Sequence, residues 1–237
     1  MYQSSFVGSA CNRKEEEAGE KTVSYIDMNQ TKMLAALEER KLVPVVKLDR
    51  VEDAKPLAEA LCKGGLPVAE VTFRTDAAEE SIRIMRQEFP DMLVGAGTVV
   101  NVAQAQRAKQ AGASFIVSPG LSKDVIEYAI ANDIPVFPGT CTPSEVMTAM
   151  SYGLEVVKFF PAKQYGGLAT IKALAAPFPT MRFMPTGGVN ADNLEEFLAF
   201  DKIIACGGSW MVKDSLIKEG RFDEIERLTR EAVEKLK

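Results

Sequence analysis

The 237-residue chain has 46% apolar residues and a net charge of -5, which suits one large domain and argues against nucleic-acid or anionic-membrane partners. No apolar run reaches the length of a membrane span. The chain contains no histidine, so catalytic triads and imidazole-based zinc sites are excluded, including that of a zinc-dependent aldolase.

Residues 1–28 precede the patterned part of the chain and are polar, mixed in charge and without a sustained period. We predict a mobile N-terminal tail or extension there, followed by a single domain over residues 29–237. The short apolar segment before Cys11 lacks the basic start and apolar core of a signal peptide. The four cysteines show neither zinc nor disulfide spacing, which favours a reducing, cytoplasmic location.

A helical pattern begins at residue 29, and expected strands and helices then alternate to the end of the chain. The expected strands are 43–46, 68–73, 92–96, 115–117, 135–137, 155–160, 181–184 and 203–206. The helix-period segments are 51–63, 77–88, 102–111, 122–132, 143–150, 168–175, 191–199 and 222–236. Such alternation predicts parallel strands with right-handed crossovers, and eight units predict an α/β fold of the (β/α)8 TIM-barrel type.

The structural alternative is a doubly wound open sheet, which would carry a glycine-rich phosphate loop after its first strand. No such loop follows residues 43–46. Glycine-rich turns fall instead at 187–188 and 207–209, after the seventh and eighth expected strands. Phosphate sites recur there in TIM barrels, because backbone N–H groups at glycines approach an anion closely. Ordinary tight turns remain the alternative interpretation.

One lysine, Lys158, lies inside the sixth expected strand, among β-branched and aromatic residues. Because an ammonium ion is costly to remove from water, a buried lysine pairs with a carboxylate or loses its proton readily. A neutral amine is a nucleophile, so we predict that Lys158 forms a Schiff base with a substrate carbonyl. A strand-edge lysine that reaches solvent is the alternative.

Strand alternation places Glu70 and Arg74 on one face of the second strand, and we expect this face to point into the barrel. Glu70 would then meet Lys158 across the barrel and exchange protons with it, although a buried structural ion pair is the competing interpretation. Arg74 would stand at the strand mouth with its guanidinium free for a carboxylate, unless it pairs with a surface acid.

Three further strand ends carry candidate groups. Lys47 ends the first strand and is a rival Schiff-base candidate, although its neighbour Asp49 suggests a wetter position. Thr98 and the turn at 118–120, which contains Pro119, could bond substrate oxygens, and simple turns explain them equally well.

Six segments of the chain, in order between about residues 42 and 212, together resemble the KDPG/KHG aldolase family. They are AEVTFRT at 69–75, GAGTV at 95–99, FIVSPG at 115–120, VKFFPA at 157–162, PTGGV at 185–189 and GGSW at 207–210. The resemblance implies a class I aldolase that needs no metal or cofactor, on a TIM barrel, usually as a homotrimer. It implies cleavage of 2-keto-3-deoxy-6-phosphogluconate to pyruvate and glyceraldehyde 3-phosphate. The galactonate epimer, and 4-hydroxy-2-oxoglutarate with release of glyoxylate, stay open as substrates.

The resemblance also implies roles for individual residues. Lys158 resembles the Schiff-base lysine and Glu70 the general base, while Phe160 matches a position that packs beside the imine. Some family members carry an arginine in place of Lys47, so the contact made by Lys47 stays open. The expected substrate-binding residues are Arg74, Thr98, Pro119, Phe160 and Thr186, and the expected phosphate-binding residues are Gly187, Gly188, Gly207, Gly208 and Ser209.

Two other functions remain compatible with a barrel. A phosphosugar isomerase or epimerase could use late phosphate turns, but the missing histidines and the lack of a dense carboxylate cluster for a metal count against it. A non-catalytic scaffold or binding module would leave Lys158 inert.

Overall fold

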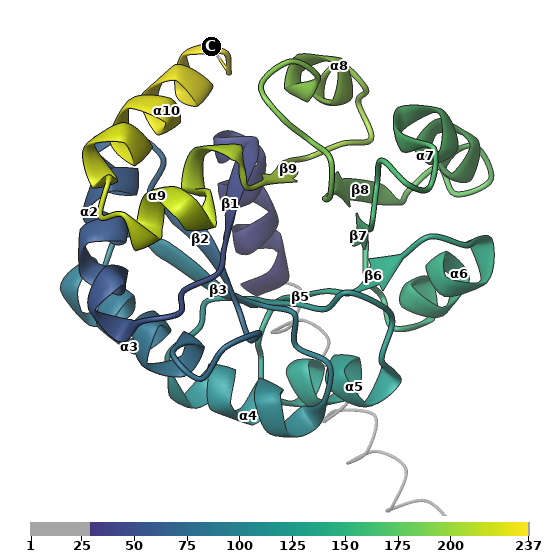
Figure 1. Ribbon diagram of the computed structural model, residues 1–237. Coiled ribbons are helices and arrows are strands. Elements are labelled where there is room, and N and C mark those ends of the chain that lie inside the picture. The colour runs from purple at the N-terminus through teal and green to yellow at the C-terminus, as the bar shows by residue number, and fades with distance from the viewer. Residues whose placement is uncertain (1–28, 237) are drawn as a thin grey trace, which may run out of the picture.

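The computed structural model describes residues 29–236 and arranges them as a ring of parallel strands enclosed by helices (Figure 1). The predicted tail at residues 1–28 lies outside the described residues. Within 29–236, none of the helices combines the length and the apolar character that crossing a bilayer demands.

Nine short strands occur among the described residues. They are β1 Leu42–Val46, β2 Val68–Thr72, β3 Leu93–Gly97, β4 Ile116–Val117, β5 Val136–Phe137, β6 Gly139–Thr140, β7 Val156–Phe159, β8 Arg182–Pro185 and β9 Cys206–Gly208. β5 pairs with β4, whereas β6 pairs with β7, and only Pro138 separates the two segments. They therefore share one position in the ring, which has eight positions in the described chain.

Parallel pairing runs around the ring in the order β5-β4-β3-β2-β1-β9 and continues from β6 through β7 to β8. Isolated bridges from Phe183 to Ile203 and from Thr186 to Gly207 join β8 to β9 and close the ring. The predicted TIM-type barrel is thereby confirmed.

The helices form the outer layer around the strands (Figure 1). Helical turns occupy 29–40, and they are followed by η1 Val51–Asp53, α2 Ala54–Lys63, α3 Ala78–Glu88, α4 Val102–Gln110, α5 Lys123–Ala131, α6 Pro143–Ser151, α7 Gly167–Ala175, α8 Leu194–Leu198, η2 Trp210–Val212, α9 Asp214–Lys218 and α10 Phe222–Glu234. The C-terminal helix α10 packs beside α2, where the backbone at Gly64 leaves room for the buried Thr229.

Several parts of the structure differ from the sequence-based expectation. The last strand, expected at 203–206, is β9 at Cys206–Gly208, and the strand expected at 135–137 is interrupted at Pro138 and continues as β6. η2 and α9 were not expected, because each is too short to show a helical period in the sequence. α8 begins at Leu194 rather than 191, because the side chains of Asn190 and Asn193 accept hydrogen bonds from backbone N–H groups of the turn before it.

The barrel interior has an aromatic layer beside a polar one. Register pairs Glu70 with Gly95, so both face inward, and a Cβ on Gly95 would lie 2.1 Å from the ring of Phe115. The rings of Phe115 and Phe137 meet edge to face with their centroids 6.0 Å apart. These rings fill the space beside Glu70, which leaves the carboxylate in a dry, packed interior.

Candidate active site

Lys158 on β7 and Glu70 on β2 meet inside the barrel, from the sixth and second positions of the ring. The Nζ atom of Lys158 lies 3.4 Å from Oε1 of Glu70. The residues are only 5% and 2% exposed. This is the predicted meeting across the barrel, and it excludes the alternative of a lysine that reaches solvent.

Glycine on a neighbouring strand makes room for the Glu70 carboxylate. A Cβ on Gly97 of β3 would lie 2.2 Å from Oε1 of Glu70, so the carboxylate occupies space that any side chain there would take. Lys158 is fixed from the other side, because its Nζ lies 4.9 Å from the ring centroid of Phe160. The two groups are thus held by packing on both sides.

A buried pair of this kind contributes little to stability, because the loss of hydration offsets much of the attraction between the charges. It is well suited to proton transfer, since a carboxylate within hydrogen-bonding reach can accept the proton that an amine must lose before it attacks a carbonyl. The arrangement therefore matches a nucleophile with its base.

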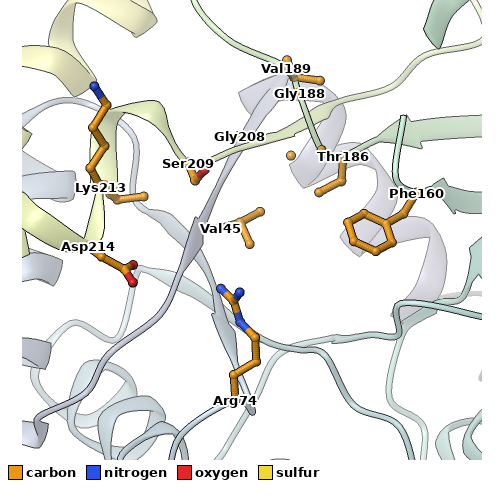
Figure 2. Close-up of a pocket in the computed structure, with 13 residues that line it drawn as sticks. Val45, Arg74, Phe160, Thr186, Gly188, Val189, Gly208, Ser209, Lys213 and Asp214 are labelled. Atoms are coloured by element: carbon orange, nitrogen blue, oxygen red, sulfur yellow. The ribbon is translucent and has the colours of Figure 1, made fainter. Parts of the chain in front are cut away.

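Arg74 stands at the mouth of the barrel, just beyond the end of β2. Its Nε donates to Oγ1 of Thr72 at 3.0 Å, and that hydroxyl donates to the carbonyl of Val46 at 2.9 Å. Figure 2 shows the guanidinium turned into the cavity, and within the described residues no acid forms an ion pair with it. The terminal nitrogens therefore remain available for a carboxylate of a ligand.

A cavity of about 410 Å³ is bordered by Arg74 and Phe160, whereas the buried pair Lys158 and Glu70 is not part of its lining (Figure 2). Its predicted lining residues are Arg74, Phe160, Thr186, Gly187, Gly188, Gly207, Gly208 and Ser209. Its other lining residues are Val45, Val189, Val212, Lys213 and Asp214. Both glycine-rich segments that the sequence singled out thus lie on one cavity. Gly187 and Gly188 follow β8 as expected, but the expected turn after the last strand is wrong for Gly207 and Gly208, which belong to β9 itself.

The two glycine-containing segments, after β8 and within β9, need glycine for different reasons. Gly187 and Gly188 have φ angles of 94° and 86°, in the left-handed region that side chains disfavour. A Cβ on Gly207 would lie 2.3 Å from Oγ1 of Thr186, and one on Gly208 would lie 2.1 Å from the ring of Trp210. Side chains at 207 and 208 would therefore collide with Thr186 and Trp210.

Thr98 and Pro119 lie at the same end of the barrel but outside the lining of this cavity. Thr98 directly follows β3, is half-buried and has a φ of 57°. The carbonyl oxygen of Pro119 would lie 2.2 Å from a Cβ on Gly139, which pairs in register with Lys158. Pro119 thus abuts the strand position next to the buried lysine, on the side away from the glycine turns.

Lys47, the rival candidate, is engaged by acids. Its Nζ lies 2.7 Å from Oδ1 of Asp49 and 3.4 Å from Oδ2 of Asp214. The hydrogen bond with Asp49, together with the charge of Asp214, raises the pKa of Lys47 above its ordinary value. A more firmly protonated amine is a weaker nucleophile, so the geometry favours Lys158.

Sequence reasoning missed part of the cavity wall. Val45 stands beside the inward-facing Glu70 in the register of β1 and β2, and this register could not be read from the sequence. Lys213 and Asp214 follow β9 in a segment without a readable period, so no local signal indicated that they reach the cavity. Within residues 29–236, no group of three or more potential ligand side chains is placed to hold a metal ion.

Comparison with known proteins agrees with this geometry. A family model for KDPG and KHG aldolase matches residues 33–228. A 2-dehydro-3-deoxy-phosphogluconate aldolase of Treponema pallidum is 47% identical over 199 residues, covering 84% of this chain and 95% of the relative.

Two solved structures are also similar. The KDPG aldolase of Legionella pneumophila, with pyruvate captured as a covalent carbinolamine intermediate, has a TM-score of 0.78 and 39% identity, over 80% of this chain and 92% of that one. The 2-keto-3-deoxy-6-phosphogluconate aldolase of Zymomonas mobilis ZM4, with 3-phosphoglycerate, has a TM-score of 0.79 and 39% identity, over 84% of this chain and 94% of that one.

Proposed function

Because the chain belongs to the KDPG and KHG aldolase family, we propose that Lys158 forms a Schiff base with a 2-keto acid whose C3–C4 bond the enzyme then cleaves. The enzyme is a lyase, as its relatives are. The observation that carries the proposal is the buried contact of 3.4 Å between Lys158 and Glu70. No cofactor is required, since the iminium itself accepts the electron pair of the broken bond.

The reaction begins when Glu70 takes one proton from Lys158 and the neutral amine adds to the C2 ketone. Glu70, directly or through a water molecule, passes this proton and then a second one from the nitrogen to the carbinolamine oxygen, which leaves as water and gives the iminium. Glu70 next removes the proton of the C4 hydroxyl, the C3–C4 bond breaks and its electrons form the enamine of pyruvate. A proton from Glu70 to C3, followed by hydrolysis, releases pyruvate and restores Lys158.

Arg74 would orient the substrate by binding its carboxylate with the free end of the guanidinium. This grip holds C2 within reach of Lys158, while the ring of Phe160 packs beside the imine. Thr98 and Pro119 would border the pyruvoyl end, and Thr186 the side of the substrate chain. These roles follow from the resemblance, and the positions of Arg74, Phe160 and Thr186 on the cavity support them.

We propose a phosphorylated substrate, 2-keto-3-deoxy-6-phosphogluconate, with 4-hydroxy-2-oxoglutarate as a second one. Gly187 and Gly188 after β8, with Gly207, Gly208 and Ser209 at the end of β9, would receive the phosphate in this cavity, whose lining does not include Lys158. Binding energy at the phosphate would hold the reacting carbons in place. Comparing the rate of cleavage of the galactonate epimer with that of 2-keto-3-deoxy-6-phosphogluconate would test the stereochemical preference at C4.

The test is borohydride reduction of the protein in the presence of pyruvate, followed by peptide mass mapping. We expect a reduced pyruvoyl adduct on Lys158 and none after Lys158→Ala, with pyruvate release abolished in that variant. Lys172→Ala is the matched control, because Lys172 also lies over an aromatic ring, that of Phe200 at 5.6 Å, but is exposed on α7. An adduct on Lys47, or full activity of Lys158→Ala, would contradict the proposal.

We further infer a homotrimer. Its support is the family resemblance and a group of exposed apolar side chains near one another in sequence, Met147 and Met150 on α6 and Tyr165 beyond β7. Met147 and Met150 stand three residues apart, so they share a helix face, and exposed apolar surface of this kind is typical of subunit contacts.

A cytoplasmic location is also part of the proposal. Its support is that Cys62, Cys141 and Cys206 are free thiols, which suits a reducing compartment. The measurement is fractionation of the producing cells, with the enzyme activity assayed in each fraction. Recovery of the activity outside the cytoplasmic fraction would contradict this location.

A further inference from the structure

An acid lies on the wall of the cavity where a phosphate would bind. Asp214 lines the same cavity as Gly207, Gly208 and Ser209, and both groups come from the segment that follows and includes β9 (Figure 2). An unpaired carboxylate there would repel a phosphate dianion and weaken its binding. A cation paired with Asp214 would therefore favour phosphate binding at this end of the barrel, where Lys213 also lines the cavity.

The structure places a cation against this acid from a different part of the chain. Nζ of Lys47, directly after β1, lies 3.4 Å from Oδ2 of Asp214. The same ammonium lies 2.7 Å from Oδ1 of Asp49, and Lys218 lies 3.0 Å from the other oxygen of Asp49. Four side chains thus form a charge chain in the order Lys218, Asp49, Lys47, Asp214. It ties the end of β1 to both ends of α9.

We propose that Lys47 is a positioning residue for phosphorylated substrates, which acts through Asp214 rather than by touching the phosphate. It neutralises the acid beside the phosphate turn and holds the carboxylate toward the end of β1. This inference rests on the proposed function. It identifies Lys47 as the residue that reduces the repulsion between Asp214 and the phosphate dianion of the substrate.

Two observations favour an indirect role. Lys47 is absent from the cavity lining, whereas Asp214 is part of it. The ammonium of Lys47 also donates hydrogen bonds to Asp49 and Asp214, so two of its three donors already have partners. Because both side chains are partly exposed, water weakens the interaction, and the expected effect is a few-fold change in affinity rather than loss of activity.

The test compares Lys47→Met, Asp214→Asn and the double variant on a phosphorylated and an unphosphorylated substrate. With 2-keto-3-deoxy-6-phosphogluconate, we expect Lys47→Met to raise KM by roughly three- to ten-fold with little change in kcat. With 4-hydroxy-2-oxoglutarate, the KM should change by less than about two-fold. Adding Asp214→Asn to Lys47→Met should return the phosphorylated substrate to about the original KM, because no acid is left to neutralise.

Lys55→Met is the matched control, since Lys55 makes a comparable exposed ion pair with Glu88 at 2.8 Å but on the outer helices. An equal loss on both substrates would overturn the inference and show a merely structural role. A raised KM that persists in the double variant would overturn it as well, because Lys47 would then bind the phosphate itself.

Failure of the proposed function is distinguishable from failure of this inference. If the unaltered protein cleaves neither substrate, the aldolase proposal falls, and calorimetric binding of inorganic phosphate to the same variants decides the inference. Weaker phosphate binding in Lys47→Met that is restored in the double variant supports it. Equal binding by all the variants overturns it.

Discussion

The Glu70 carboxylate has its place in the barrel because residue 97 is a glycine. We expect Gly97→Ala to lower kcat by roughly ten-fold or more, because the new methyl group would displace the oxygen that now lies 2.2 Å from its position. The end of a glutamate side chain can move aside, so the fold should survive. The measurements are steady-state kinetics and thermal unfolding of the same sample.

Gly95→Ala provides the contrast to this variant. A Cβ there would meet the rigid ring of Phe115 at 2.1 Å rather than a flexible side-chain end. We expect this change to reduce the free energy of unfolding by about 1–3 kcal/mol. If Gly97→Ala lost stability but kept its kcat per folded molecule, the proposed role of Glu70 would be wrong.

Arg74 permits a second prediction at the scale of one residue. Arg74→Ala should raise KM for the 2-keto acid by roughly ten-fold or more, because a charge-assisted pair with the carboxylate is lost. Arg74→Lys should recover only part of this loss, since lysine keeps the charge but cannot form two parallel hydrogen bonds. Full recovery in Arg74→Lys would show that charge alone matters at this position.

At the scale of elements, α6 is anchored by a capping box directly after β6, the strand in which Gly139 pairs with Lys158. Thr142 accepts from the N–H of Glu145, and Glu145 accepts from the N–H of Thr142 at 2.9 Å. We expect Thr142→Ala to lower the free energy of unfolding by about 1 kcal/mol, measured by urea denaturation. Ser144→Ala, on the same helical turn but outside the box, should change it little.

The ion pair between α3 and α4 should make a contribution to stability that depends on pH. Arg107 lies 2.7 Å from Glu79, and its hydrogen bond lowers the pKa of Glu79 below its ordinary value of 4.5. Because the pKa of Glu79 is lower in the folded protein, its ionised form stabilises the fold at pH values above the ordinary pKa. This stabilisation is lost as the pH falls through the folded-state pKa.

Between pH 6 and pH 3, therefore, the unaltered protein should lose more unfolding free energy than Glu79→Gln, by about 1 kcal/mol or less. Urea denaturation at several pH values measures this difference. Equal slopes of stability against pH would contradict it. Glu196→Gln is the control, because Glu196 forms no ion pair within the part of the chain that the structure describes.

At the scale of the whole molecule, the exposed apolar side chains give a prediction about assembly. Met147 and Met150 on α6 are 60% and 38% exposed. We expect Met147→Glu to weaken the proposed trimer, because a buried, unpaired carboxylate at an interface is costly. Light scattering after size-exclusion chromatography measures the mass. An unchanged trimer in this variant would place the interface elsewhere.

The order and type of the elements could be read from local periods, because helices repeat every 3.6 residues and strands every two. Strand alternation also put Glu70 on the inward face, and the apolar surroundings of Lys158 indicated its burial. The same local signals could not locate α9 or the interruption at Pro138, since a short turn of helix and a break in pairing leave no period.

Glu70 and Lys158 were therefore identifiable from the sequence alone, because each is a charged residue within a predicted strand whose neighbouring residues are largely apolar. Only the tertiary structure decided that Lys47 is held by Asp214, 167 residues away, and that the glycines after β8 and within β9 share one cavity. Such contacts depend on the register in which the ring of strands closes. Closure is a property of the whole chain, which no single segment encodes.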